Sequence, residues 1–260
     1  MTPIQAYDHA RDRALLLFRL CEGLTNRRSR SIRSDWKASF CTLMHWPQNS
    51  EIQRIDGKDA IVILRDGCSL HESDFGAVVF QELLRSALVM SVSALDRYMH
   101  ERITKKIVGA LQKGNLCKEQ NEFLIPATVA IQVAIKMVNA RKETEKKAIR
   151  PANEIRNAIQ ELLFKRTFQS WREIEEGFRL IGVLGLSGKL QPAYQVADMG
   201  PTKSTLNKIA RTRNRIVHEA DLVRHKKGGK PRLHPISASD VRNAIEFLDD
   251  LVKKLELVTA

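Results

Sequence analysis

RTRNRIVHEAD, residues 211–221, places a guanidinium, an amide and an imidazole on one predicted helix, which runs from about Thr202 to Asp221. Arg213, Asn214 and His218 fall within about one and a half helical turns. Groups of this kind can bind a phosphate and transfer protons near neutral pH. The stretch therefore predicts an anion-binding and proton-transferring site on a helix.

Helical periodicity gives this helix an apolar stripe. Its members are Leu206, Ile209, Ala210, Ile216, Val217 and Ala220. Arg213 falls in the middle of the stripe, where a buried guanidinium needs an acidic partner or a bound anion. Asn214 and His218 are four residues apart and share one flank. Part of the stripe should therefore line a polar cleft or a subunit contact. A structural salt bridge for Arg213, with simple packing of His218, is the alternative.

The Arg-to-His spacing alone carries little information. With 24 arginines and 7 histidines in 260 residues, one fixed spacing is expected about 0.65 times by chance. The position of Arg213 on the helix, rather than the spacing, is what points to a site.

The charge of the chain indicates a polyanionic partner. It has 43 Lys and Arg against 30 Asp and Glu, a formal net charge of +13. Such an excess favours nucleic acid over an anionic membrane surface, although a generic basic bias remains an alternative. The four cysteines form no C-x-x-C pair and follow no secretory signal, so we expect reduced thiols and a cytoplasmic protein. No apolar run approaches the roughly 20 residues of a membrane span, and no membrane partner is expected.

Nearly all of the chain has helical periodicity, which predicts an all-α fold. Helices are expected over residues 3–24, from Ser34 through Phe40, over 73–111, from Pro126, from Pro151, from the capping box at Ser170, over 202–221 and from Ser237. The apolar segment 86–95 predicts a central buried helix. Residues 51–68 fit either a hairpin or a buried helical turn, and the Gly- and Pro-rich stretch 182–201 predicts a loop.

The motif and its context resemble the HEPN superfamily. Its signature is an arginine, then a polar residue, then a histidine four to six positions after the arginine, as in Arg213–His218. The helix ending in residues 94–100 resembles the early core helix of a HEPN branch found with bacterial defence and RNA-repair genes. The resemblance covers about residues 72–258. It implies a HEPN-like helical bundle over 72–260, preceded by an N-terminal helical segment, 1–71.

The resemblance implies a metal-independent endoribonuclease that needs no cofactor. In such an enzyme the ribose 2′-OH attacks the adjacent phosphate, leaving a 2′,3′-cyclic phosphate and a 5′-OH. His218 would be the general base or acid, and Arg213 would hold the scissile phosphate. Asn214 would orient His218 or the phosphate. Asp96 could pair with Arg213; an exposed acid without a role is the alternative.

The resemblance also implies a homodimer that joins two motifs in one composite site, and a toxin or anti-phage defence effector with an antitoxin or defence-system partner. Two basic segments are candidates for gripping an RNA backbone, although a solvated loop is the alternative. They contain Lys226, Lys227, Lys230, Arg232, Arg27, Arg28, Arg30 and Arg33. His225 and His234 have no acidic or cysteine partners at metal-ligand spacing, so no metal site is expected.

Two other classes of function remain open on the sequence. One is a non-catalytic HEPN-like protein that binds RNA or acts as a scaffold in a toxin–antitoxin or defence system. The other is a basic helical DNA-binding protein, although no helix-turn-helix pair stands out.

Overall fold

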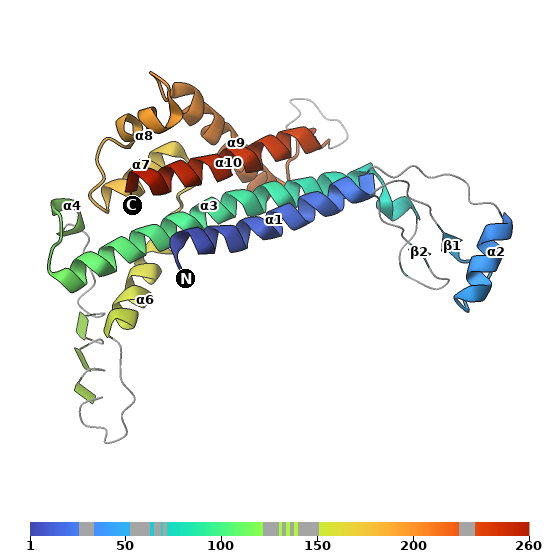
Figure 1. Ribbon diagram of the computed structural model, residues 1–260, viewed down its shortest axis with the longest axis horizontal. Helices are drawn as coiled ribbons and strands as arrows, with labels where there is room; N and C mark the ends of the chain where they lie inside the picture. Colours follow the sequence, from blue (N-terminus) through green and yellow to red (C-terminus); the bar gives the residue numbers. More distant parts are fainter. Residues whose placement is uncertain are drawn as a thin grey trace. The chain divides into compact units, whose positions relative to one another are not determined.

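The computed structural model is built from α-helices, which confirms the predicted all-α class (Figure 1). It describes residues 1–25, 34–52, 63–64, 69, 72–121, 130–131, 134–135, 138–139, 151–223 and 232–259. The helices are α1 (Pro3–Thr25), α2 (Ser34–Leu43), α3 (Ala77–Lys113), α4 (Lys118–Asn121), α6 (Pro151–Leu163), α7 (Trp171–Arg179), α8 (Leu186–Tyr194), α9 (Gly200–Glu219) and α10 (Ala238–Thr259). A short 3₁₀ helix, Glu72–Phe75, precedes α3.

Several helices begin where their capping residues predict. The Ser170 hydroxyl accepts a hydrogen bond from the backbone N–H of Glu173, and the Glu173 carboxylate accepts one from the N–H of Ser170. This reciprocal pair satisfies N–H groups that the first turn of α7 leaves without a helical partner. Ser237 likewise accepts from the N–H of Asp240 at 3.1 Å, at the start of α10. Local sequence therefore sets both of these boundaries.

The chain divides into two compact units. The first comprises residues 1–11, 91–214 and 246–260, and the second comprises 12–90 and 215–245. Helices α1, α3, α9 and α10 each contribute residues to both units. Both units draw on residues before and after position 71, and the division into an N-terminal helical segment, 1–71, and a HEPN-like bundle, 72–260, stays a prediction.

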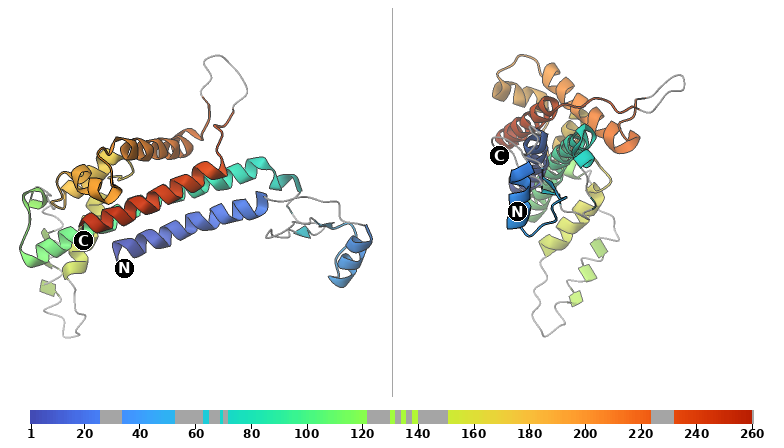
Figure 2. Two further views of the ribbon diagram at one scale, coloured as in Figure 1. Left: turned by 45° about the horizontal axis from the view of Figure 1, so that its top comes forward. Right: turned by 90° about the vertical axis from the view of Figure 1, so that its right-hand side faces the viewer.

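The first unit is organised around α3. Leu95, Tyr98, Met99 and Ile103 of that helix are fully buried in one apolar cluster. The cluster also receives side chains from the start of α1, from α6 to α9, and from the end of α10. Figure 2 shows α10 running beside α3 in both views. The predicted central, buried helix is therefore present, and it extends beyond residue 95 because the apolar pattern continues through Ile107.

The second unit has a smaller apolar core and a short hairpin. Phe18 and Cys21 of α1 are buried in it, and the Arg242 guanidinium lies 5.5 Å from the centre of the Phe18 ring. Strands β1 (Glu51–Ile52) and β2 (Ile63–Leu64) pair antiparallel. Of the two interpretations of residues 51–68, the structure supports the hairpin.

Two sequence predictions need correction. The stretch 182–201 is not all loop, because Leu186 and Leu190 bury their side chains and hold a helix, α8, despite the glycines and Pro192 around them. Gly185, with φ of +64°, allows the tight entry to α8. The long helix begins at Ala77 rather than Ser73. The helix predicted from Pro126 falls largely outside the described residues; pairs 130–131, 134–135 and 138–139 are helical.

α3 also corrects the expectation about membrane spans. By length and composition it is apolar enough to cross a membrane, with 44% of its most apolar window buried inside the protein. A core helix of a soluble protein passes the same test, so this single helix is weak evidence. Packing in the core accounts for the buried part of α3, which includes Leu95, Met99 and Ile103.

Candidate active site

The motif helix α9 is anchored by its N-terminal part. Leu206 and Ala210 are buried in the first unit, 1% and 5% exposed. Further along the same stripe, Val217 is 45% exposed. The apolar stripe is therefore buried at its N-terminal end and exposed at its C-terminal end. Arg213 lies between these two parts.

Arg213 is half-buried and incompletely hydrogen-bonded. Its Nη1 donates to the Asn214 side-chain oxygen at 3.1 Å. Its Nε is buried and has no hydrogen-bond partner among the described residues. A buried N–H without a partner costs about 1–3 kcal/mol. The guanidinium therefore has hydrogen-bonding capacity that the described residues do not use.

Asp96, on α3, lies close enough to Arg213 for its carboxyl to feel the positive charge. Burial raises the pKa of Asp96, while the Phe168 N–H, His100 and Arg213 act in the opposite direction. Oδ1 accepts a hydrogen bond from the backbone N–H of Phe168 at 2.6 Å. The charge of Arg213 on α9 therefore acts on Asp96 of α3, while a direct pair between them stays a prediction.

His100 is a further member of this cluster and was not predicted as a site residue from the sequence. Its Nε2 lies 3.8 Å from Oδ2 of Asp96 and 3.1 Å from the carbonyl oxygen of Arg166. Its ring meets the Phe168 ring edge-on, with centroids 5.1 Å apart. The signal that could have found it is the spacing of four between Asp96 and His100 on one helix.

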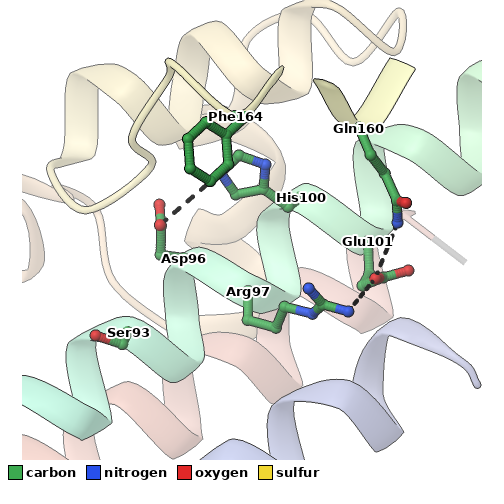
Figure 3. Close-up of a pocket in the computed structure, with 7 residues that line it drawn as sticks. All are labelled: Ser93, Asp96, Arg97, His100, Glu101, Gln160 and Phe164. Carbon is green, nitrogen blue, oxygen red and sulfur yellow. Dashed lines mark hydrogen bonds and ion pairs between the residues drawn. The ribbon is translucent and has the colours of Figure 1, made fainter. Parts of the chain in front are cut away.

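A cavity of about 360 Å³ adjoins Asp96 and His100 (Figure 3). Its walls come from α3, α6 and the residue that follows α6. They are formed by Ser93, Asp96, Arg97, His100, Glu101, Gln160 and Phe164. The volume lies within the range of small-molecule sites, about 300–1,000 Å³.

Asn214 and His218, the other two motif residues, are exposed on α9. The sequence places them on one flank of the helix, and the side chain of Asn214 turns toward Arg213. An exposed imidazole is accessible to a substrate and to solvent protons, both of which an acid–base group requires.

The end of α9 is held within the second unit by a buried ion cluster. Asp221, 2% exposed, accepts from Arg85 Nε at 2.8 Å and from Arg215 Nε at 2.6 Å. Arg85 also donates to the carbonyl oxygen of His234 at 2.6 Å. Ala220 and Asp221 both have positive φ, which turns the chain sharply after the helix. This cluster fixes the backbone just beyond His218.

Comparison with known protein families shows which family the chain belongs to. The RiboL-PSP-HEPN family model matches residues 64–259, three quarters of the chain. This chain belongs to the RiboL-PSP-HEPN family. No match was found among curated proteins or among solved structures. HEPN domains are generally nucleases or otherwise related to RNA.

The RiboL-PSP-HEPN match includes the motif helix, Asp96 and the cavity, and it begins before the predicted boundary at residue 72. Most of the basic residues predicted to contact RNA, namely Lys226, Lys227, Lys230, Arg27, Arg28, Arg30 and Arg33, lie outside the described residues. Arg232 is described and exposed, and its carbonyl oxygen accepts from the N–H of Val223 at 2.7 Å. Within the described parts of this HEPN chain, no three His, Cys, Asp or Glu side chains gather to hold a metal ion.

Proposed function

We propose that this HEPN protein is a metal-independent endoribonuclease that cleaves RNA by transesterification. The observation that carries the proposal is Arg213: a half-buried guanidinium on the motif helix, beside Asp96, with an unused buried N–H. A phosphate oxygen is the acceptor that suits such a group.

Each motif residue has a role in this chemistry. A base takes the proton of the ribose 2′-OH as its oxygen attacks phosphorus, and an acid protonates the departing 5′-oxygen. His218 serves as one of these groups, since an imidazole can both accept and donate a proton. Arg213 stabilises the extra negative charge on the phosphate in the transition state. Asn214 orients Arg213 through the hydrogen bond between them, and Asp96 positions the guanidinium by its charge.

A homodimer completes the site in this proposal. One chain supplies one motif imidazole, whereas the reaction uses both an acid and a base. Two copies related by a two-fold axis would bring two His218 side chains to one cleft. The exposed apolar residues Val217, Leu222 and Leu233, all in the second unit, are suited to such a contact.

The biological role that we propose is that of a toxin or anti-phage defence effector in the cytoplasm, kept inactive by an antitoxin or defence-system partner. The excess of +13 charges supports RNA as the substrate. We propose that the two basic segments around residues 27–33 and 226–232 grip the RNA backbone.

The test is cleavage of total RNA in the presence of EDTA, with the new ends mapped. We expect cleavage to survive EDTA and to leave cyclic-phosphate and 5′-OH ends. His218→Ala should abolish cleavage while keeping most RNA binding, whereas His9→Ala, at an exposed position on α1, should cleave normally. Divalent-dependent cutting with 5′-phosphate ends contradicts this mechanism. Unchanged cleavage by His218→Ala contradicts the assignment of the histidine.

Mixing two inactive variants tests the composite site. Chains carrying His218→Ala and chains carrying Arg213→Ala should together recover part of the activity if each cleft uses residues from both copies. A monomer at micromolar concentration that still cleaves RNA would rule the dimer out.

A further inference from the structure

Phe164 is the most exposed aromatic side chain at the cavity, with 84% of its surface accessible. It follows the last residue of α6, and its backbone N–H still bonds to the carbonyl oxygen of Gln160 at 2.9 Å. The backbone of Phe164 is therefore fixed while its ring stands free at the wall of the cavity (Figure 3). A flat apolar ring beside a polar cavity is the arrangement on which nucleobases stack.

The Glu101 carboxylate on one wall of the cavity already has its polar partners. Glu101, 3% exposed, pairs with Arg97 at 2.7 Å and with Arg156, and it also accepts from the Gln160 amide at 3.3 Å. This carboxylate is held by three partners. It shapes the cavity and leaves little capacity for a ligand.

Asp96, unlike Glu101, has a carboxylate oxygen without a hydrogen-bond partner among the described residues. Its Oδ1 accepts from the Phe168 N–H, but Oδ2 accepts no hydrogen bond from any described residue and lies 3.8 Å from the imidazole of His100. The side chain is 22% exposed and lines the cavity. Oδ2 is therefore a hydrogen-bond acceptor available to whatever occupies the cavity.

Asp96 connects the cavity with the proposed phosphate site, because it lines the cavity and its carboxyl responds to the charge of Arg213. Arg213 is close enough to Asp96 for its charge to act on that carboxyl. A nucleotide whose phosphate binds Arg213 therefore has its base or sugar near the cavity.

We propose that the cavity is a nucleobase subsite for single-stranded RNA: one unpaired base stacks on Phe164 and donates its exocyclic amino group to Oδ2 of Asp96. Carboxylates accept from such amino groups in nucleic-acid recognition. Uracil is disfavoured, because it presents a carbonyl oxygen where adenine and cytosine present the amine. This subsite rests on the proposed function and names the substrate preference of the same site.

Binding of oligonucleotides that cannot be cleaved tests the subsite. Short single-stranded oligomers of deoxyadenosine, deoxycytidine and deoxyuridine lack the 2′-OH nucleophile, so the full wild-type chain can be titrated with each at fixed salt. We expect tighter binding of the adenine and cytosine oligomers than of the uracil oligomer. Phe164→Ala should weaken adenine and cytosine binding about tenfold, in the range for one base stacked on one aromatic ring.

Two control variants separate stacking from other effects. Phe164→Trp should retain binding, because it keeps an aromatic surface. Leu257→Ala removes an apolar side chain that is 74% exposed on α10 and should leave binding unchanged. Sedimentation of the same variants checks whether Phe164 instead covers a second copy of the chain.

The outcomes distinguish the subsite from the nuclease. Unchanged affinity of Phe164→Ala, equal binding of all three oligomers, no binding by the wild type, or an effect of Phe164 only on oligomeric state each overturns the subsite, whether or not RNA is cleaved. Base-dependent binding that requires Phe164, in a chain that cleaves no RNA, supports the subsite and overturns the endoribonuclease.

Discussion

Asp96 and Asp221 are two largely buried aspartates that differ in the number of polar partners of their carboxylates. Asp221, in the second unit, is 2% exposed and receives one arginine on each carboxylate oxygen. Asp96, in the first unit, is 22% exposed and lines a cavity; one of its oxygens accepts a backbone N–H, and the other accepts no hydrogen bond from a described residue. A fully paired carboxylate stabilises structure, whereas one with an unused oxygen at a cavity is available to a ligand. The first should therefore govern stability and the second should govern activity.

The largest effect on stability is expected from Asp221→Ala. The substitution leaves Arg85, 3% exposed, with only the exposed Glu82 as an acidic partner, and breaking a buried pair costs about 3–5 kcal/mol. The free energy of unfolding in urea measures it. Asp8→Ala is the control. It removes an ion pair between Arg11 and Asp8, whose side chain is 43% exposed, and should lower the free energy of unfolding by less than about 1 kcal/mol. Equal costs for the two variants would contradict a structural role for Asp221.

Gly177→Ala should have the next largest effect on stability. It tests the packing of α7 against Phe168, whose backbone N–H binds Asp96. A Cβ at this position of α7 would lie 2.9 Å from the Phe168 ring and 3.0 Å from Ile103 and Met99. Overpacking of this kind costs about 1–3 kcal/mol. Because the N–H of Phe168 binds Asp96, we also expect slower cleavage.

Gly109→Ala is the matched control for Gly177→Ala. A Cβ at Gly109 of α3 meets nothing within 4 Å, so alanine should stabilise the helix by up to about 1 kcal/mol. Thermal unfolding of both variants gives the comparison. A stable, fully active Gly177→Ala protein would show that the contact between α7 and α3 tolerates a methyl group.

Arg215→Ala should cost about 1 kcal/mol. Arg215 is 32% exposed, and Asp221 keeps Arg85 when it is lost. A double-mutant cycle with Asp221→Ala, measured by urea unfolding, gives the coupling energy. A cost as large as that of Asp221→Ala would mean that Arg215, rather than Arg85, is the main partner of the buried carboxylate.

Asp96→Asn should have the smallest effect on stability and a clear effect on cleavage. The asparagine oxygen can still accept from Phe168, but the charge beside Arg213 is lost, so we expect cleavage to slow about tenfold or more.

Burial raises the pKa of Asp96 in the folded protein, so folding favours its protonated form. Wild type should therefore lose stability relative to Asp96→Asn as pH rises from about 4 through the raised pKa.

Asp249→Asn is the control with the opposite sign. Burial raises the pKa of Asp249, but hydrogen bonds from Lys253 and Arg11 outweigh it and the pKa is lowered. Its stabilising contribution is therefore present above the unfolded pKa, about 4, and is lost as pH falls through the lowered pKa. Unfolding free energies measured between pH 3 and 8 should show opposite trends for the two variants. Parallel trends would contradict the environments described for both carboxylates.

Local sequence signals predicted most helices but failed where burial outweighed them. The capping residues Ser170 and Ser237 marked helix starts that the structure confirms. The glycines and proline of 182–201 predicted a loop, whereas burial of Leu186 and Leu190 favours α8. Burial against distant elements is not visible in a short window of sequence.

The candidate site was predicted in part. The residues on α9 followed from a motif within one helix, and Asp96 was named as a potential partner of Arg213. His100, Phe168 and the cavity were not found, because they come together only through contacts between elements. Asp96 and Phe168 are 72 positions apart in the chain.

The sequence by itself determined the helical class, the capped helix starts and the grouping of Arg213, Asn214 and His218 on one helix, because each of these depends on residues a few positions apart. Only the tertiary structure decided that the motif stripe is core at Leu206 and open at Val217, and that one aspartate is saturated while the other faces a cavity. The reason is that the burial of a side chain and the number of its polar partners depend on which distant segments pack against it.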